Sequence, residues 1–457
     1  MLKETLFIEF RCHVDDGAFP EPLFEVISLT VKEELSRPYE IIVQLTSSRN
    51  DFYLDDFIRK PANIRLDFGK SFRDFNGLIG EMSQKTMVFS PEGEPQYHYQ
   101  VKIYPNLWFL QFDNHFRIFQ EIPALEIVRT LFYENGIEHF TFPKVYDEPV
   151  REFCVQYDES TFNFINRLLE DRGVYYYFKH TPTNHSLHLG NAPHDQMQTE
   201  FAEEIIIQDI YSKNSELNTI STYEIYSSMI PKTVSIMDYD YNKASQELIS
   251  SIHGAAKGGT FYEYPGNYTY MEQGEIDTRM RMDIKEGGLQ NLRGKSYVPF
   301  FCPGHMFPLM NHPHPSFNNA IFTIKKVEHF IKNARFCSPE EELYYNNFDS
   351  FPTQAPYRPE RKTPKPRIYG SQTALVVGPP GEEVWTDELG RVKVQFRWNH
   401  RGYLGPTIMQ SVAASNEEFD TRENANQSPQ LGLYGPGTTQ PEMTFPFQAT
   451  ESEGEGV

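Results

Sequence analysis

The fold of this chain is decided by the stretch Gly390-Arg391-Val392-Lys393-Val394-Gln395-Phe396-Arg397-Trp398. From Arg391 onward polar and apolar residues alternate without a break, so the valines and aromatics share one face and the charged or amide residues share the other. A period of two predicts a half-buried β-strand, because successive side chains leave opposite faces of the pleat. The preceding Asp387-Glu388-Leu389-Gly390 has the Asp and the Gly that a type I turn prefers. We therefore predict a β-meander that opens a small barrel.

A second apolar run, Thr373–Val377, precedes this strand and ends at Gly378-Pro379-Pro380-Gly381. Two prolines between glycines fit neither a helix nor an inner strand, which indicates a loop. The glycines, valines, aromatic and charged residues of this region form one motif with characteristic spacing. Its members are Gly378, Gly381, Glu383, Asp387, Gly390, Arg391, Val392, Val394, Phe396 and Trp398. Together they resemble the start of the OB-fold in VgrG proteins, which are the spike-and-hub proteins of type VI secretion systems and are related to the hub and spike of contractile phage tails.

Further pieces of the chain resemble the same family, in the order that the family uses. They are Tyr157-Asp158 before an apolar helix, Gly173 and Tyr176 after that helix, Asp238-Tyr239, and Pro265-Gly266. The resemblance covers roughly residues 6 to 402 in collinear pieces. It implies a structural role for all these motif residues, and it implies no catalytic, cofactor-binding or metal-binding residue.

Periodicity predicts a mainly β fold with a few helices, an α+β class. Short strand-like runs separated by Pro, Gly, Asp and Asn predict strands at Leu6–Phe10, Ile27–Lys32, Tyr39–Leu45, Ala62–Phe68 and Tyr97–Tyr104. A period of about 3.6 residues predicts helices over 122–135, over 160–173 with Ser160 as N-cap, and over 271–285. A strand is predicted at Val174–Phe178, and a strand pair at 304–307 and 320–329.

The resemblance implies a phage-hub-like pair of β-barrel domains followed by an incomplete OB-fold. The predicted division is 1–150 for the first hub domain with its helix, 151–355 for the second hub domain, 356–370 for a stiff linker rich in Pro and Lys, 371–402 for the start of the OB-fold, and 403–457 for a tail. The tail is polar and acidic, which predicts disorder. We therefore expect an OB-fold that is truncated and leaves an open sheet edge, which another chain must cover.

Composition limits the partners. The chain has 457 residues and a net charge of -21, and such a surface repels the phosphate backbone of nucleic acids, which bind through Lys and Arg. The four cysteines are far apart in the sequence, which favours buried free thiols formed in a reducing compartment. Charged residues in the first ten positions argue against a signal peptide, and no apolar run is long enough for an integral membrane segment. We expect synthesis in the cytoplasm.

Four sequence patterns could indicate a catalytic or binding site, and the structural interpretation is favoured for each. His312 and His314 alternate and would share one face of a strand, but no third metal ligand is fixed nearby. The glycine-rich Gly254–Thr260 lacks the order that a phosphate-binding loop needs, because its Lys precedes the glycines. Glu382-Glu383 has no spacing that indicates a glycosidase.

The fourth pattern is a basic strip on the predicted strand Arg391–Trp398. It consists of Arg391, Lys393 and Arg397. OB-folds often bind single-stranded nucleic acid with such strips. Here the aromatic residues lie on the opposite face of the strand, so they cannot grip a base together with these charges. A solvated face or a subunit contact is the favoured interpretation.

The resemblance therefore predicts a structural hub and spike component, without enzymatic activity and without cofactors. It implies a homotrimer that stacks on the Hcp tube, contacts baseplate proteins and carries PAAR-type tip or effector proteins. It also implies export by the type VI machinery without a signal peptide. Two alternatives stay open, namely the baseplate hub of a phage or phage-tail-like particle, and an effector-bearing enzyme variant.

Overall fold

The computed structural model describes most of the chain in two compact units. The described residues are 6–12, 23–69, 71–89, 93–143, 148–192, 195–207, 217–240, 245–338, 340–377, 386–387, 390–398 and 443–444. The first unit consists of 1–113, 122–151 and 160–365, and the second of 114–121, 152–159 and 366–457. Among the described residues no helix has both the length and the apolar character needed to cross a lipid bilayer.

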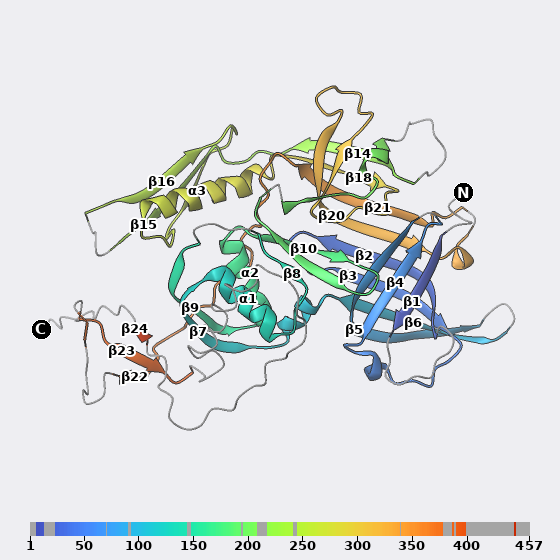
Figure 1. The fold of residues 1–457 in the computed structure, drawn as a ribbon, viewed down its shortest axis with the longest axis horizontal. Coiled ribbons are helices and arrows are strands. Elements are labelled where there is room, and N and C mark those ends of the chain that lie inside the picture. The colour runs from blue at the N-terminus through green and yellow to red at the C-terminus, as the bar shows by residue number, and fades with distance from the viewer. Residues whose placement is uncertain are drawn as a thin grey trace, which may run out of the picture. The chain divides into compact units, whose positions relative to one another are not determined.

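One large sheet dominates the first unit (Figure 1). Its strands, in spatial order, are β1 (Phe7–Cys12), β4 (Pro61–Asp67), β5 (Phe72–Phe89), β6 (Pro95–Tyr104), β3 (Glu40–Ser47), β2 (Glu25–Glu34), β20 (Ala320–Lys332), β21 (Tyr344–Pro352), β18 (Gln290–Ser296), β14 (Thr219–Ser227) and β13 (Ile206–Ile207). Two further strands, β12 (Met197–Gln198) and β19 (His305–Leu309), join it through β20. Neighbouring strands are antiparallel except in the pairs β13–β14 and β12–β19.

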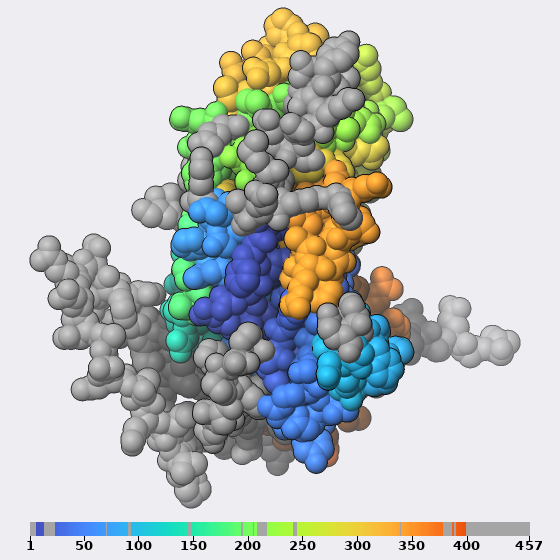
Figure 2. All heavy atoms as spheres, turned by 90° about the vertical axis from the view of Figure 1, so that its right-hand side faces the viewer, coloured from blue at the N-terminus to red at the C-terminus, as the bar shows by residue number. Residues whose placement is uncertain are grey.

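The sheet is continuous because β2 pairs with β20, from Ser28 opposite Lys332 to Glu34 opposite Lys326. This pairing joins strands from the two ends of the hub region, and we call it the seam. Figure 2 shows blue N-terminal strands lying directly against the orange residues of β20 and β21. The two predicted halves of the hub region therefore share one hydrogen-bonded sheet.

The strand predictions follow the burial pattern. In β3, Ile41, Val43 and Leu45 are buried while the residues between them are partly exposed, as the alternation predicts for a strand with one covered face. The predicted strand pair at 304–307 and 320–329 is the antiparallel pair β19–β20. The predicted mainly β fold class with a few helices is confirmed.

The predicted helices are present with bounds close to those expected. They are α1 (Ala124–Glu134), α2 (Thr161–Asp171) and α3 (Met271–Glu286). The Ser160 hydroxyl accepts a hydrogen bond from the Asn163 N–H at 3.2 Å, which is the predicted N-cap of α2. Short 3₁₀ turns occur at η2 (Leu54–Phe57), η3 (Asn106–Gln111), η5 (Ala202–Glu204) and η7 (Ala334–Phe336).

Two smaller sheets complete the first unit. The strand predicted at Val174–Phe178 is β10 (Tyr175–His180), which pairs with β11 (His185–Gly190) and through it with β8 (Phe140–Thr141). The other sheet has β15 (Thr233–Asp238) between β16 (Leu248–His253) and β17 (Thr260–Glu263), and α3 packs against it. The Gly254–Thr260 segment is the connection between β16 and β17, which agrees with a structural interpretation.

The second unit contains two small sheets. One pairs β7 (His115–Pro123) with β9 (Val150–Glu159), although the ends of both strands lie in the first unit. The other has the order β22 (Ala374–Val377), β23 (Lys393–Phe396) and β24 (Met443–Thr444). The predicted meander is therefore present as the antiparallel pair β22–β23.

One expectation about this region needs correction. The predicted strand Arg391–Trp398 is hydrogen-bonded as a strand only over Lys393–Phe396, and both of its faces are partly exposed. Alternation fixes the direction of side chains, but full burial requires a second packed layer. The predicted disordered tail, 403–457, lies outside the described residues except for Met443–Thr444, which pairs with β23 as a third strand, and its disorder stays a prediction.

A matched pair of glycines after α1 and α2 gives a test of the packing. Gly136 and Gly173 both have positive φ, at 68° and 63°. A Cβ added at Gly136 would meet no atom within 4 Å, whereas one at Gly173 would lie 2.5 Å from the Met280 Sδ. We predict that Gly136→Ala lowers the free energy of unfolding by about 1 kcal/mol, from backbone strain alone, and that Gly173→Ala lowers it by at least about 1 kcal/mol more. Urea denaturation of both variants checks this, and equal midpoints would contradict it.

Candidate functional site

Asp238, one of the predicted motif residues, holds the turn that leads into α3. Its carboxylate accepts hydrogen bonds from the backbone N–H groups of Tyr239 at 2.7 Å, of Tyr268 at 3.2 Å, and of Asn267. Three backbone donors on one carboxylate make strong, charge-assisted hydrogen bonds. The side chain of Tyr239 itself is exposed. The Asp238 side chain is therefore committed to fixing the backbone.

Pro265 and Gly266, the next predicted motif, lie against the same strand. The peptide bond between Tyr264 and Pro265 is cis. The Gly266 N–H donates to the carbonyl oxygen of Met237 at 2.9 Å. A Cβ on Gly266 would lie 2.5 Å from the Ile236 side chain, so only glycine fits this approach. Two motifs that are separate in the sequence thus meet at the end of β15.

Tyr176 and Gly173 connect α2 and β10 to distant parts of the first unit. Tyr176 is buried, its hydroxyl donates to the Asn166 Oδ1 at 3.1 Å, and its carbonyl oxygen accepts from the Ser36 N–H at 2.7 Å. Burial raises the pKa of the Tyr176 hydroxyl, so it stays a neutral donor. The Gly173 carbonyl oxygen accepts from the guanidinium of Arg358 at 3.2 Å.

The Arg358 contact belongs to a longer strap, residues 356–365, which we call the clasp. Glu170 in α2 accepts three hydrogen bonds from it: from the Lys362 N–H at 3.0 Å and from the N–H and hydroxyl of Thr363, both at 2.9 Å. Arg361 forms ion pairs with Glu263 and, at 3.8 Å, with Asp171. The clasp therefore ties α2 to β17 at the point where the chain leaves the first unit.

In the second unit, Tyr157 and Trp398 meet, although they come from motif regions far apart in the sequence. Their ring centroids are 5.1 Å apart with an interplanar angle of 87°, and Phe116 lies 5.0 Å from Tyr157. Gln372 donates to the Tyr157 hydroxyl and accepts from the Trp398 indole N–H at 2.9 Å. We call these four residues the aromatic anchor. The neighbouring motif residue Asp158 accepts from the Asn114 side chain at 2.6 Å.

The predicted turn before β23 is built around Asp387. Its Oδ1 accepts from the Arg391 N–H at 2.9 Å, its carbonyl oxygen accepts from the Gly390 N–H at 3.0 Å, and its carboxylate also pairs with the Arg391 guanidinium. The Arg391 charge is therefore already compensated within the turn. This removes one member of the basic strip and weakens a nucleic-acid interpretation.

The other predicted motif residues of this region divide into two groups. Val392 bridges Thr386, Val394 and Phe396 lie in β23, and the Phe396 ring stacks on Trp398 at 5.1 Å. The remaining motif residues, Gly378, Gly381 and Glu383, lie outside the described residues. So does Glu382, which completes the acidic pair Glu382-Glu383.

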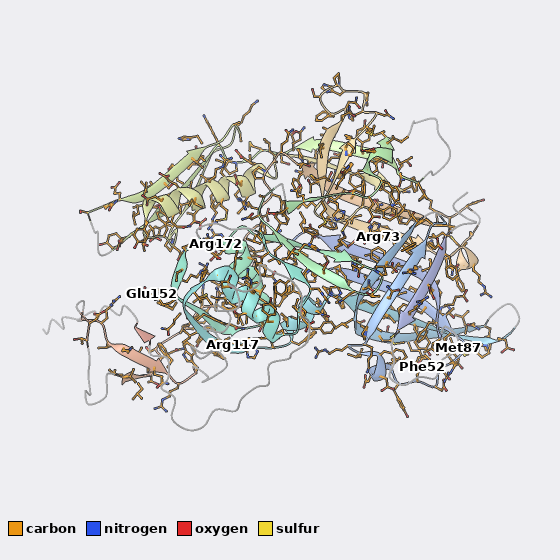
Figure 3. The ribbon with its side chains drawn as sticks, viewed as in Figure 1. Phe52, Arg73, Met87, Arg117, Glu152 and Arg172 are labelled. Atoms are coloured by element: carbon orange, nitrogen blue, oxygen red, sulfur yellow. The ribbon has the colours of Figure 1, made fainter. Side chains whose placement is uncertain are left out.

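A buried charge cluster at the seam was missed by the sequence analysis. Arg73 on β5 (Figure 3) pairs with Glu33 on β2 at 2.9 Å, and it also donates to the carbonyl oxygens of Pro299 and, at 2.7 Å, Phe301. Glu33 is only 4% exposed. The signal that could have revealed the cluster is Glu33 itself, because alternation places it on the same face as the buried Val31.

Two histidines complete this cluster. His329 on β20 places its Nδ1 2.8 Å from the Tyr344 hydroxyl and its Nε2 3.6 Å from the Glu33 carboxylate. His180 on β10 accepts the Asn76 N–H at its Nδ1, at 3.1 Å, so in the neutral ring the proton is on Nε2, which faces Glu33 at 3.7 Å. That distance is too long for a hydrogen bond, so the contribution is a dipole directed at the carboxylate.

Burial and charge set the protonation of the cluster. Burial alone would raise the pKa of Glu33, but Arg73 and the two imidazoles lower it well below its usual value. Burial, followed by the charge of Arg73, lowers the pKa of His329 to about 4. Near neutral pH the cluster therefore holds one ion pair beside a neutral His329. The cluster can fix the strands electrostatically, and within it the His180 Nε2 is buried without a hydrogen-bond partner.

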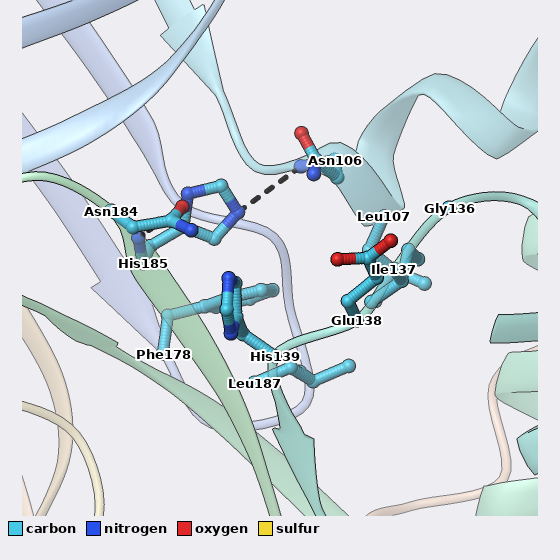
Figure 4. A pocket seen from close by; sticks show the side chains of 10 residues that line it. All are labelled: Asn106, Leu107, Gly136, Ile137, Glu138, His139, Phe178, Asn184, His185 and Leu187. Atoms are coloured by element: carbon cyan, nitrogen blue, oxygen red, sulfur yellow. Dashed lines mark hydrogen bonds between the residues drawn. The ribbon is translucent and has the colours of Figure 1, made fainter. Parts of the chain in front are cut away.

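A cavity in the first unit lies between η3, the loop after α1, and the β10–β11 hairpin (Figure 4). Its volume is about 250 Å³, and Glu138, His139 and His185 face it. The Asn106 N–H donates to the His185 Nε2 at 3.4 Å, and burial lowers the pKa of His185 to about 3. The ionisable side chains among the ten lining residues are Glu138, His139 and His185.

His312 and His314 have local partners for their rings. The His312 Nδ1 accepts from the His314 N–H at 3.0 Å, and the His314 Nδ1 accepts from the Ser316 N–H at 3.2 Å. Both rings also contact Phe317. In the described part of the chain no group of three His, Cys, Asp or Glu side chains is arranged to hold a metal ion. The cysteines there are free thiols, of which Cys154 and Cys302 are buried.

The aromatic anchor predicts how β22 and β23 are held. Tyr157→Ala removes both ring contacts and the Gln372 bond, and we expect the local opening free energy of β22–β23 to fall by about 2 kcal/mol. Amide exchange at 374–377 and 393–396 should then become roughly thirtyfold faster. Tyr157→Phe keeps the ring and is the matched control, with a change of less than about threefold. Unchanged exchange in Tyr157→Ala, measured by mass spectrometry, would show that the anchor does not hold this pair.

The buried histidines predict an acid-sensitive fold. Burial lowers the pKa of His329 and His305 to about 4 and that of His185 to about 3, against about 6.5 in an unfolded chain. Between these values the unfolded chain binds more protons, so stability falls as the pH falls. From pH 7 to pH 5 we expect the first unit to lose about 5 kcal/mol of unfolding free energy. Urea midpoints at both pH values measure this loss.

A histidine variant separates this effect from general acid sensitivity. His329→Gln should remove part of the loss between pH 7 and pH 5, because one of the histidines whose pKa is lowered by burial is gone. His253→Gln, at an exposed position on β16, is the control and should leave the loss unchanged. A His329→Gln variant with the full loss would refute the assignment.

Comparisons with known proteins agree with this architecture. A family model described as phage tail baseplate hub (GPD) matches residues 32–334. The type VI secretion system spike protein VgrG1b of Pseudomonas aeruginosa is 30% identical over 413 residues, covering 88% of this chain and 54% of that protein. The chain thus spans about half the length of this curated relative.

Solved structures show the same fold. An Escherichia coli type VI secretion system component, described as similar to the bacteriophage T4 tail proteins gp27 and gp5, aligns with a TM-score of 0.62 at 17% identity, covering 86% of this chain and 91% of that chain. A chain of the Francisella PdpA–VgrG complex aligns with a TM-score of 0.52 at 11% identity, covering 98% of this chain and 74% of that chain. The chain therefore belongs to the phage tail baseplate hub family that includes the VgrG spike proteins.

Proposed function

We propose that this chain is a structural hub of a type VI secretion spike. In this role it assembles as a homotrimer, stacks on the Hcp tube and baseplate proteins, and carries PAAR-type tip or effector proteins toward target cells. It leaves the producing cell with the machine. The observation that carries the proposal is the continuous similarity to a VgrG spike protein over 88% of this chain.

The chemistry of the described residues supports a structural role. Buried Glu33 is paired with Arg73, and Arg73 also donates to the backbone carbonyl of Phe301. The clasp and the aromatic anchor use the motif residues to join distant segments. We propose accordingly that the chain has no enzymatic activity of its own and needs no cofactor.

A second candidate is the baseplate hub of a phage or phage-tail-like contractile particle. The observation in its favour is the family model itself, which is that of a phage tail hub and covers residues 32–334. An effector-bearing enzyme variant would need a catalytic extension, and the residues that could supply one, 403–457, lie almost entirely outside the described part of the chain.

The proposal is tested with the purified full chain and purified Hcp rings. We expect mass photometry to show a particle of three chains, and electron microscopy to show Hcp rings stacked on it. In cells that lack their own VgrG and carry a functional type VI machine, the chain should restore Hcp in the medium. A monomer at micromolar concentration that binds no Hcp ring would refute the proposal, and binding to a phage tube protein instead would favour the second candidate.

A pair of variants shows whether the assembled fold is needed for this activity. Arg73→Gln leaves Glu33 buried without its charge partner, which costs about 3–5 kcal/mol, so both the trimer and Hcp export should be lost. Arg335→Gln changes an exposed arginine paired with Glu25 and should retain both.

A further inference from the structure

The last part of the clasp is held without a buried residue of its own. The part before it is anchored by Pro359, which is buried, and by the Tyr357 ring, which contacts the rings of Tyr175 and Phe351. None of the following residues, 360–365, is buried, and we call this segment the latch. A segment held by hydrogen bonds and ion pairs close to solvent opens more easily than the packed elements around it.

Two of the carboxylates that hold the latch each have a second cation. Glu263 accepts a hydrogen bond from the Arg361 guanidinium and also lies 3.4 Å from the Nε of Arg281. Asp171 lies 3.8 Å from the Arg361 guanidinium and 3.5 Å from that of Arg151. Both carboxylates therefore stay paired when Arg361 leaves. This removes the main cost of breaking a partly buried ion pair, which is the charge left without a partner.

The third carboxylate, that of Glu170, is partly exposed on α2. It accepts its three hydrogen bonds from Lys362 and Thr363. Water can replace these donors when the latch leaves, because the carboxylate is at the surface. Lys365, the last cation of the latch, lies 3.9 Å from Asp171 and is itself exposed. Opening therefore leaves no buried charge of the latch or of its carboxylates uncompensated.

Arg281 gains a partner when the latch opens. It is only 6% exposed, and its Nη1 is buried without a hydrogen-bond partner. Burial, followed by the charge of Arg361, lowers the pKa of the Arg281 guanidinium, so the two arginines repel each other across the Glu263 that they share. Asp277 supplies a further negative charge near Arg281. When Arg361 leaves, the Glu263 oxygen that it held becomes available to the Arg281 Nη1, and a guanidinium that holds both oxygens of one carboxylate forms a strong bidentate pair.

We propose that the latch is a two-state strap in which Glu263 is shared by Arg361 and Arg281 in the closed state and is held by Arg281 alone in the open state. In the closed state the latch lies on α2 and β17. In the open state it joins the segment 366–371, in which no residue is buried either, as one free length of chain. That length can extend to about 40 Å, against about 20 Å for 366–371 alone. The latch thus sets how much free chain precedes β22, and it does so within the first unit, without the proposed trimer.

Hydrogen exchange of the purified full chain, followed by mass spectrometry, tests whether the latch opens by itself. Peptides that contain 360–365 should exchange at a rate that low concentrations of urea do not change, whereas exchange in β3 should accelerate with urea. Raising the NaCl concentration from about 0.05 M to about 0.5 M should speed exchange in the latch roughly threefold and leave β3 unchanged, because salt screens ion pairs near solvent. Latch amides that exchange only together with those of β3 would overturn the proposal.

Substitutions of the two arginines should act in opposite directions. Arg361→Gln removes the cation of the closed state and should speed exchange in the latch about fivefold. Arg281→Lys keeps the charge but cannot hold both oxygens of Glu263, so the open state is disfavoured and exchange in the latch should slow about threefold. Glu275→Gln, at an exposed position on α3, is the control and should leave the rate unchanged.

The direction of the Arg281→Lys effect separates the two-state strap from a strap held by fixed contacts. A merely structural Arg281 would loosen its surroundings when replaced, so exchange in the latch would become faster. The urea midpoint of Arg281→Lys is measured alongside, because slower exchange in a chain that is no more stable overall cannot come from global stabilisation. An equal or faster rate in Arg281→Lys, or an unchanged rate in Arg361→Gln, refutes the exchange of Glu263 between the two arginines.

Discussion

The rest of the first unit depends on the pairing of β2 with β20. Seven residue pairs, from Ser28 with Lys332 to Glu34 with Lys326, close the sheet between strands at opposite ends of the hub region. The chain between these two strands, residues 35–319, therefore forms one closed loop that begins and ends at the seam. Without the seam, the strands before β6 and those after β18 would belong to two sheets with open edges, which are prone to non-native pairing.

The charge cluster explains how the seam is fixed in register. A buried carboxylate is costly unless it is paired and hydrogen-bonded, and Glu33 has Arg73 from β5 together with His329 from β20. A slip of one residue in β2 would turn Glu33 to the other face of the sheet and deprive Arg73 of its carboxylate partner. The cluster therefore penalises the wrong register more than it stabilises the right one.

Local patterns in the sequence predicted most elements but not their partners. Alternation at Tyr39–Leu45 and the Ser160 cap are decided by nearby residues, so β3 and α2 were found close to their true bounds. The seam and the meeting of Tyr157 with Trp398 are decided by segments far apart in the chain, and no local period contains that information. The Glu33 position did carry a signal, a charge on the buried face of a strand, whose partner only the folded sheet identifies.

The geometry of the seam suits a part that must transmit force. In an antiparallel pair the hydrogen bonds run perpendicular to the strands, so a pull along β2 or β20 loads all the bonds of the seam together. The clasp acts in the same way at the exit of the chain, because Glu170 holds two consecutive residues, Lys362 and Thr363, by three bonds that share the load. Parallel loading of this kind resists the separation of the paired segments, because no single bond carries the whole force.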